Sequence, residues 1–365
     1  MEYTPCNFLC SLLCLLYVQA IAQDWGVIME ERENINKIYK IEDIARELGV
    51  SKTTVSRAIS GKGRISKATT KRVMDFIATH DYRPNAMAKG LAQSKTYNLG
   101  VVLPVEYEAM EFAFFKDCLI GICQAAAECN YDIMLCMVNG KDLTQIERLV
   151  INRKVDGIIL SRAIVSSSAQ KYLKEKKVPF VVIGPNPDKS VISVDNKNRE
   201  ACRELTSILL MKGNKKLALI GGSETHRVTE SRYQGFADAF KEAGRDIKES
   251  PVIMNADGFL DVSRAVRQVL DKGADCIVCM DDFICTQVIG CLRENRIRVP
   301  DDIRIASFYD NSQLEFDNPS VTSIRFDTKE LGKKACYKLL HILGEVTEDK
   351  IRQPGYQVIL RESTM

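Results

Sequence analysis

The sequence predicts a small all-α unit near the N-terminus, followed by a larger α/β domain built on parallel sheets. The 365 residues exceed what one hydrophobic core usually holds, so two or three domains are expected. Positive charge is concentrated in residues 37–95, which contain thirteen Lys or Arg and five Asp or Glu. After Lys95, short apolar runs alternate with segments of helical length, which is typical of parallel sheets covered by helices.

Residues 1–38 are a leader that we do not expect to belong to the fold. The apolar stretch 8–18 resembles part of a signal peptide, but it is short for a membrane span and only Glu2 is charged before it. Trp25 and Gly26 are encoded by a guanine-rich run that resembles a ribosome-binding site shortly before Met29. We therefore expect that Met29 is the true start and that the protein is cytoplasmic, with a membrane anchor as the alternative.

Cysteine and histidine usage indicates neither a disulfide framework nor a metal site. Most of the thirteen cysteines lie within apolar runs, as expected for reduced core thiols in the cytosol. Cys276 and Cys279 have CxxC spacing, but in a buried strand residues three apart point to opposite faces. The three histidines, His80, His226 and His341, form no ligand pattern, and we expect them to be structural. We predict no metal and no cofactor.

Two short helices around a glycine turn are predicted near the N-terminus. Apolar side chains at helical spacing indicate a first amphipathic helix, and Gly49 then interrupts it; these side chains are Ile41, Ile44, Ala45 and Leu48. Ser51 is a suitable N-cap for a second helix over residues 52–59, which Gly61 ends. Ser66 caps a third helix that extends to about His80. This arrangement is typical of a helix-turn-helix unit.

The second helix presents hydroxyls, cations and its positive dipole end, and such a surface suits a DNA groove. Its outward side chains are Lys52, Thr53, Thr54, Ser56 and Arg57. Lys52 and Thr53, which come first on the helix, are placed to contact base edges. An ordinary three-helix bundle with no DNA function is the alternative.

The sequence around these helices closely resembles the LacI/GalR family of bacterial transcriptional regulators. The resemblance is carried by YKIEDIARELGVSKTTVSRAISGKGRIS and by YRPNAMAKGLAQSKTYNLGVVLP, and it is unbroken from Tyr39 to Leu103. It implies a helix-turn-helix domain over residues 39–83 and a hinge over 84–96, whose Leu91 would wedge into the minor groove of the operator. The residues expected to contact DNA are Ile41, Ser51, Lys52, Thr53, Thr54, Ser56, Arg57, Ser60, Arg64, Tyr82, Asn85, Ala88, Lys89 and Leu91.

Continuous apolar character predicts seven strands in the larger domain. They are expected at residues 99–103, 132–138, 157–161, 180–183, 216–220, 274–280 and 304–308. Ligands bind beyond the carboxyl ends of such strands, so the residues that follow each strand are candidates for a binding site.

The resemblance continues through residues 97–365 and implies a two-lobed periplasmic-binding-protein-like fold with an effector site between the lobes. We place one lobe at 97–190 and 323–350, and the other at 191–322 and 351–365. Arg232 matches the family arginine that contacts effector hydroxyls, and Asp281 matches the acid of an Asn-Asp pair whose asparagine is replaced by Met280. The further effector candidates are Phe114, Phe115, Tyr309 and Asp310.

Two of these matches depart from the family pattern. Tyr309 stands where the first aspartate of a Gly-Phe-Asp-Asp loop is usual, and Met280 removes a hydrogen-bonding group. Asp310 could instead be a structural carboxylate, and Phe114 and Phe115 could be core residues at a helix start. A sugar or sugar phosphate is the effector that the resemblance implies.

The sequence therefore predicts an allosteric, homodimeric DNA-binding regulator, expected to be a repressor, whose partners are a pseudo-palindromic operator and a small-molecule effector. A transport-type solute-binding protein would explain the α/β domain but not residues 39–95. An enzyme is the other alternative, although the sequence contains no P-loop, GxGxxG, HExxH or GxSxG motif.

Overall fold

The computed structural model describes residues 39–365 apart from 62, 81, 83–89, 91–92, 105–112, 140–141, 165–166 and 257. The chain divides into two compact units, Met1–Ala92 and Gln93–Met365. The leader and the predicted hinge contacts Asn85, Ala88, Lys89 and Leu91 lie outside the described residues.

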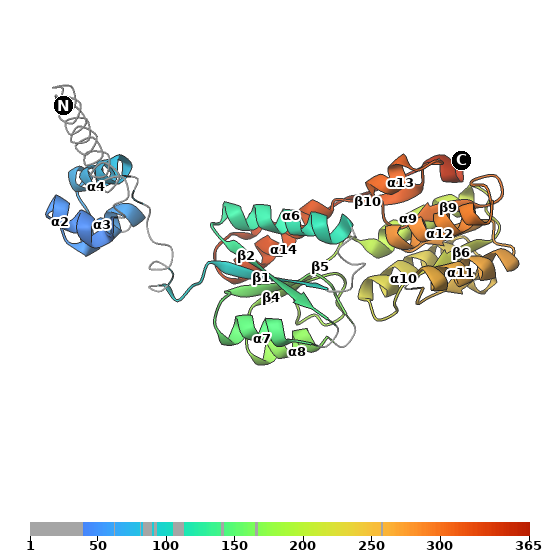
Figure 1. The fold of residues 1–365 in the computed structure, drawn as a ribbon, viewed down its shortest axis with the longest axis horizontal. Coiled ribbons are helices and arrows are strands. Elements are labelled where there is room, and N and C mark those ends of the chain that lie inside the picture. The colour runs from blue at the N-terminus through green and yellow to red at the C-terminus, as the bar shows by residue number, and fades with distance from the viewer. Residues whose placement is uncertain are drawn as a thin grey trace, which may run out of the picture. The chain divides into compact units, whose positions relative to one another are not determined.

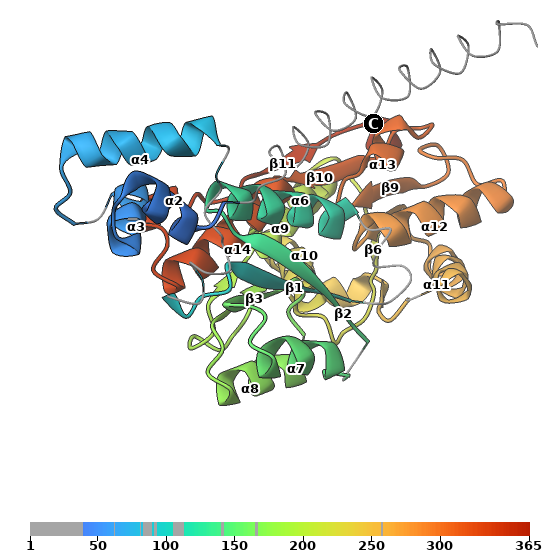
Figure 2. The ribbon, with the colours of Figure 1, turned by 60° about the vertical axis from the view of Figure 1, so that its left-hand side comes forward.

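The described part of the first unit contains three helices around a small core (Figures 1 and 2). They are α2 (Ile41–Leu48), α3 (Lys52–Ser60) and α4 (Lys67–Thr79). The expected ends are present: Gly49 is left-handed at φ 64°, and the side chains of Ser51 and Ser66 accept hydrogen bonds from the backbone of Thr54 and Thr69. The buried core side chains are Ile44, Ala45, Val55, Ala58 and Val73.

The first lobe of the second unit is a parallel five-stranded sheet in the order β2-β1-β3-β4-β5. Its strands are β1 (Asn98–Pro104), β2 (Asp132–Val138), β3 (Gly157–Leu160), β4 (Phe180–Ile183) and β5 (Ser193–Val194). Figure 1 shows α6 (Ala113–Glu128) and α14 (Thr328–Ile342) over one face, and α7 (Thr144–Ile151) and α8 (Ser168–Glu175) over the other. Both faces are therefore buried, which explains the continuous apolar strands.

The second lobe is a six-stranded sheet in the order β11-β10-β9-β8-β6-β7, parallel except for β11. Its strands are β6 (Leu217–Ile220), β7 (Val252–Ile253), β8 (Cys276–Cys279), β9 (Arg304–Ser307), β10 (Thr322–Phe326) and β11 (Tyr356–Ile359). Its helices are α9 (Asn198–Met211), α10 (Arg227–Glu242), α11 (Phe259–Asp271), α12 (Asp282–Glu294) and α13 (Ser312–Phe316), with 3-10 turns η2 (Ile247–Glu249), η3 (Glu348–Lys350) and η4 (Glu362–Thr364).

All seven predicted strands are present, together with four strands that were not predicted. Two of these four, β5 and β10, show where the chain passes from one lobe to the other. β5 pairs with β4, so the first lobe extends past residue 190. β10 pairs with β9 and β11, so residues 323–326 belong to the second sheet rather than to the first lobe. The two-residue β5 and β7 are too short to give a periodic pattern.

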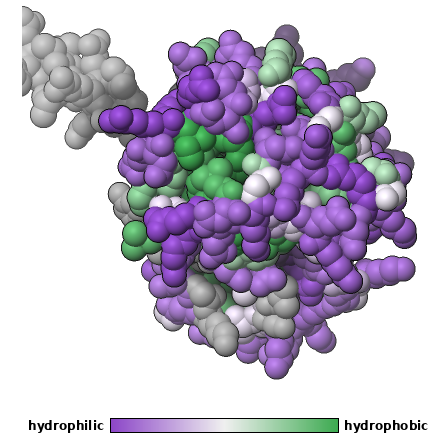
Figure 3. Space-filling view, turned by 90° about the vertical axis from the view of Figure 1, so that its right-hand side faces the viewer, coloured by the Kyte–Doolittle hydropathy of each residue, from purple (hydrophilic) through white to green (hydrophobic). Residues whose placement is uncertain are grey.

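The end of the second lobe has a mostly hydrophilic surface with an apolar area in a hollow (Figure 3). A cavity of about 230 Å³ lies at the C-terminal end of α12 and is lined mainly by aliphatic side chains, among them Ile289, Leu292, Ile297 and Val299. Among the described residues, no helix has the length and apolar character needed to cross a bilayer.

Candidate functional site

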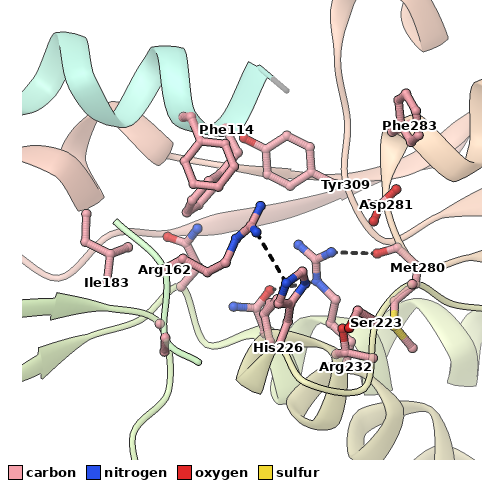
Figure 4. Close-up of a pocket in the computed structure, with 18 of the residues that line it drawn as sticks. Phe114, Arg162, Ile183, Ser223, His226, Arg232, Met280, Asp281, Phe283 and Tyr309 are labelled. Carbon is pink, nitrogen blue, oxygen red and sulfur yellow. Dashed lines mark hydrogen bonds between the residues drawn. The ribbon is translucent and has the colours of Figure 1, made fainter. Parts of the chain in front are cut away.

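A cavity of about 410 Å³ lies between the two lobes, at the carboxyl ends of strands from both sheets (Figure 4). Ser161 follows β3 and Gly184 follows β4 in the first lobe, whereas Met280 follows β8 in the second. This is where doubly wound sheets bind ligands. Five of the six predicted effector residues line the cavity: Phe114, Phe115, Arg232, Asp281 and Tyr309.

Arg232 is buried at 8% exposure on the cavity wall, near the start of α10. Its Nε donates to Asn198 Oδ1 at 3.2 Å, and its Nη1 donates to the carbonyl oxygen of Met280 at 2.7 Å. These two partners are uncharged, so the guanidinium is oriented by them without being neutralised. A buried cation held in this way favours hydrogen-bond acceptors or an anionic group on a ligand.

Aromatic rings line the cavity beside Arg232, as Figure 4 shows for Phe114 and Tyr309. Their ring centroids are 6.1 Å apart in an edge-on arrangement, and the Tyr309 hydroxyl lies 2.8 Å from Thr328 Oγ1. Burial raises the pKa of Tyr309 above its usual range, so this phenol is neutral. Phe115 packs in the core of the first lobe and lies 5.1 Å below the Arg162 guanidinium. The wall therefore offers apolar rings rather than the aspartate usual at position 309.

Two adjacent carboxyl groups lie at the start of α12. Asp281 is the N-cap, and its Oδ1 accepts a hydrogen bond from the Ile284 backbone at 2.9 Å. Asp282 is 4% exposed and accepts a hydrogen bond from Asn311 Nδ2 at 2.8 Å. Burial, and then the neighbouring Asp281 carboxylate, raises the pKa of Asp282 to about 7. The cavity thus contains an acid that changes its charge near neutral pH.

Asp310, the sixth predicted effector residue, does not line the cavity. Its carboxylate accepts from Arg361 Nη1 and from Arg325 Nε, both at 2.8 Å, and from Ser323 Oγ at 2.6 Å. Burial opposes ionisation of Asp310, but these hydrogen bonds outweigh it and lower its pKa. In this structure Asp310 joins β10 to the C-terminal segment.

Several cavity residues were not identified from the sequence. Ser161 and Asn196 line the cavity and are each 2% exposed. Ser161 Oγ and Asn196 Oδ1 have no hydrogen-bond partner among the described residues. The predicted strand 157–161 includes Ser161 as its last residue, whereas β3 ends at Leu160 and leaves Ser161 at the strand end where ligands bind. Asn196 lies just after the two-residue β5, which the sequence does not reveal.

Of the three histidines that we expected to be structural, His226 lies at the cavity. It precedes α10, lines the cavity, and its Nε2 lies 3.3 Å from Nη1 of Arg162 in the first lobe. Figure 4 shows Arg162, His226 and Arg232 converging. The other two histidines lie elsewhere: His80 stacks on Phe76, and His341 contacts the Val346 carbonyl oxygen.

The described residues contain no cluster of His, Cys, Asp and Glu that could hold a metal ion. Cys276 and Cys279 are buried in β8, and burial raises the pKa of both thiols. Buried thiols of this kind are unreactive.

The predicted DNA-contacting side chains form an exposed row on α3. Lys52, Thr53, Ser56, Arg57 and Ser60 are exposed at helical spacing, while Val55 and Ala58 face the core. Ser51 and Arg64 are also exposed, and Thr54 is half-buried beside the Ser51 cap. Ile41 and Tyr82 differ, because both are half-buried and pack against the helical core. For these two residues the structure shows a packing role.

Sequence comparisons assign the two units. The profile "Bacterial regulatory proteins, lacI family" matches residues 40–85, and the profile "Periplasmic binding protein-like domain" matches residues 206–364. The HTH-type transcriptional regulator MalR of Streptococcus pneumoniae is 30% identical over 319 residues, covering 82% of this chain and 96% of that protein. The chain belongs to the lacI family of bacterial regulatory proteins.

Other lacI-family proteins are similar over nearly the whole chain. Catabolite control protein A of Staphylococcus aureus is 26% identical, with 86% of this chain and 94% of that protein covered. The structure of a transcriptional regulator CelR-cellobiose complex has 28% identity and a TM-score of 0.65, covering 89% and 99% of the two chains. A lac repressor dimer bound to operator and the anti-inducer ONPF has a TM-score of 0.72 at 19% identity and shows the same fold.

Membership of this family explains the two units together. The protein is a DNA-binding transcriptional regulator with a helix-turn-helix unit and a two-lobed α/β domain. Membership of this family favours neither of the two alternatives considered from the sequence, an enzyme and a transport-type solute-binding protein.

Proposed function

We propose that this protein is a cytoplasmic repressor that binds a pseudo-palindromic operator as a homodimer, and that a carbohydrate bound between its lobes controls operator affinity. The interlobe cavity carries this proposal. At about 410 Å³, it is within the size range of small-molecule sites. The CelR structure named above contains cellobiose, and the lac repressor structure is a dimer on operator, which supports the same two partners here.

The cavity lining matches the chemistry of a hydroxylated ligand. Ser161 Oγ and Asn196 Oδ1 are buried and have no hydrogen-bond partner in the part of the chain that the structure describes, and a buried polar atom left unpaired costs about 1–3 kcal/mol. Ligand hydroxyls would satisfy both atoms from the first lobe, while Arg232 would bind from the second. The ring of Phe114, with Tyr309 edge-on beside it, offers an apolar surface against which the flat face of a sugar ring would stack.

Because the ligand would contact both lobes, it would favour one lobe orientation over others. Such differential binding shifts the population of dimers whose DNA-binding units can engage both half-sites. The magnitude of the effector response is then set by how differently the ligand binds the two lobe arrangements.

The test has two stages with the full-length protein. Duplexes selected from a random pool give the operator, and thermal stabilisation by a panel of sugars, sugar phosphates and nucleosides gives the effector. Arg232→Met should abolish the effect of that ligand on operator binding while leaving operator affinity in its absence within about twofold. Arg267→Met is the matched control, because Arg267 is exposed on α11 of the same lobe.

An unchanged effector response in Arg232→Met would contradict the proposed site. Absence of any preference for a selected duplex over a random competitor would contradict the proposed repressor function itself.

A further inference from the structure

Glu42, on α2, forms an ion pair with Lys52, the first residue of α3. The carboxylate Oε1 accepts a hydrogen bond from Lys52 Nζ, and the two side chains are 52% and 62% exposed respectively. This hydrogen bond is the main reason that the pKa of Glu42 is lowered. The neighbouring Asp43 is committed elsewhere, since its carboxylate accepts from the Lys40 backbone at 2.9 Å and lies 3.4 Å from Arg46.

Lys52 occupies the position on α3 where DNA recognition begins. It follows the Ser51 cap and heads the exposed row described above, which carries Lys52 and Arg57 but no acid from α3 itself. The N-terminal residues of a recognition helix contact base edges, whereas cations elsewhere contact phosphates regardless of sequence. A carboxylate bound to Lys52 therefore acts at the end of the helix that contacts the bases.

We propose that Glu42 is a specificity-determining residue of the DNA-binding unit: it pairs with Lys52 in the free protein and suppresses sequence-independent binding through that lysine. When Lys52 leaves Glu42 for a base, the energies of the two contacts favour the operator over other DNA. An exposed ion pair contributes at most about a fivefold factor to an equilibrium. A good contact between a lysine and the guanine O6 and N7 acceptors discriminates by roughly five- to 150-fold.

At a matching base pair, exchanging Glu42 for the guanine as the partner of Lys52 therefore gives a net gain in binding free energy. At a non-matching site the alternative partner is a phosphate, whose attraction for Lys52 is offset by the adjacent carboxylate. Glu42 thus weakens binding to random DNA more than binding to the operator.

The experiment compares the full-length wild type with Glu42→Gln on two duplexes, the selected operator and a scrambled duplex of equal length, over a range of salt concentrations. Glu42→Gln should bind the scrambled duplex several-fold more tightly, with a log–log salt slope steeper by about 0.9, the value expected for one additional phosphate contact. Operator affinity should change less, so the ratio of operator to scrambled affinity should fall by threefold or more.

Glu47→Gln is the matched control, because it removes one negative charge from the exposed surface of the same helix. It should leave the affinity ratio within about 1.5-fold of the wild type. Equal changes in the two substitutions, or an unchanged ratio in Glu42→Gln, would overturn the proposal.

A double variant tests whether Glu42 acts through Lys52. In a Lys52→Met background, Glu42→Gln should no longer alter the salt slope on the scrambled duplex. If the slope still steepens by about 0.9 there, the carboxylate acts by its own charge and the proposed pairing with Lys52 is wrong. Far-UV circular dichroism of each variant verifies that the helices are intact.

Discussion

Replacement of Asp310 by asparagine should destabilise the second lobe without abolishing effector binding. The Asp310 side chain is 1% exposed and the paired Arg361 side chain is 9% exposed. Breaking a buried ion pair by removing one charge typically costs about 3–5 kcal/mol. Arg361 Nη1 retains two neutral acceptors, the Val321 carbonyl oxygen and Ser323 Oγ, and the Arg325 side chain is 46% exposed, so we expect about 3 kcal/mol.

For a unit of this size, about 1 kcal/mol corresponds to roughly 2–4 °C in the unfolding midpoint. Asp310→Asn should therefore lower the midpoint of the Gln93–Met365 unit by about 6–12 °C in a calorimetric scan at pH 7. The pKa of Asp310 is lower in the folded state, so its contribution is fully present above the unfolded value of 3.8 and is lost as the pH falls through the folded value. The measurement at pH 7 is thus made where the contribution is complete.

Asp238→Asn is the control for this substitution. It removes a similar bidentate pair with Arg199, but the side chains there are 57% and 30% exposed, so the loss should be at most about 1 kcal/mol. If Asp310→Asn melts within about 2 °C of the wild type yet loses the effector response, Asp310 is a ligand-binding residue and the structural interpretation is refuted.

Three further substitutions test other parts of the structure. Asp282→Asn should leave the thermal midpoint unchanged near pH 4 and raise it at pH 8. The pKa of Asp282 is about 7 in the folded state and 3.8 in the unfolded state, so the wild-type protein is progressively destabilised as the pH rises between these values, and asparagine is not. Parallel pH profiles for variant and wild type would contradict this. Gly235→Ala should destabilise the second lobe by about 2 kcal/mol, since its Cβ would lie 2.3 Å from the Arg199 carbonyl oxygen, whereas Gly290→Ala, inside α12 with open space around it, should be no less stable than the wild type. Ser51→Ala should destabilise the helical unit by about 1 kcal/mol through loss of the α3 cap, measured by urea unfolding, and no shift would argue against that cap.

Local patterns in the sequence predicted most of the secondary structure. The capping serines Ser51 and Ser66 and the left-handed Gly49 specify helix boundaries through contacts within four residues, so they can be recognised without knowledge of the fold. Strands buried on both faces are continuous apolar runs for a similar reason. β10 was missed because it contains Thr322 and Ser323, which are polar and in sequence look like loop residues. In the fold both are buried, and their hydroxyls form hydrogen bonds with Thr364, Asp310 and Arg361.

By itself, the sequence determined the two units, the exposed row on α3 and most of the effector candidates, because each of these depends on a local motif or on the spacing of residues along one element. Only the tertiary structure decided that Asp310 pairs with Arg361 rather than facing the cavity, that Arg162 meets His226 across the lobes, and that Glu42 reaches Lys52. The partners in these pairs are separated by 51, 64 and 10 residues, so their contact is fixed by how the elements pack.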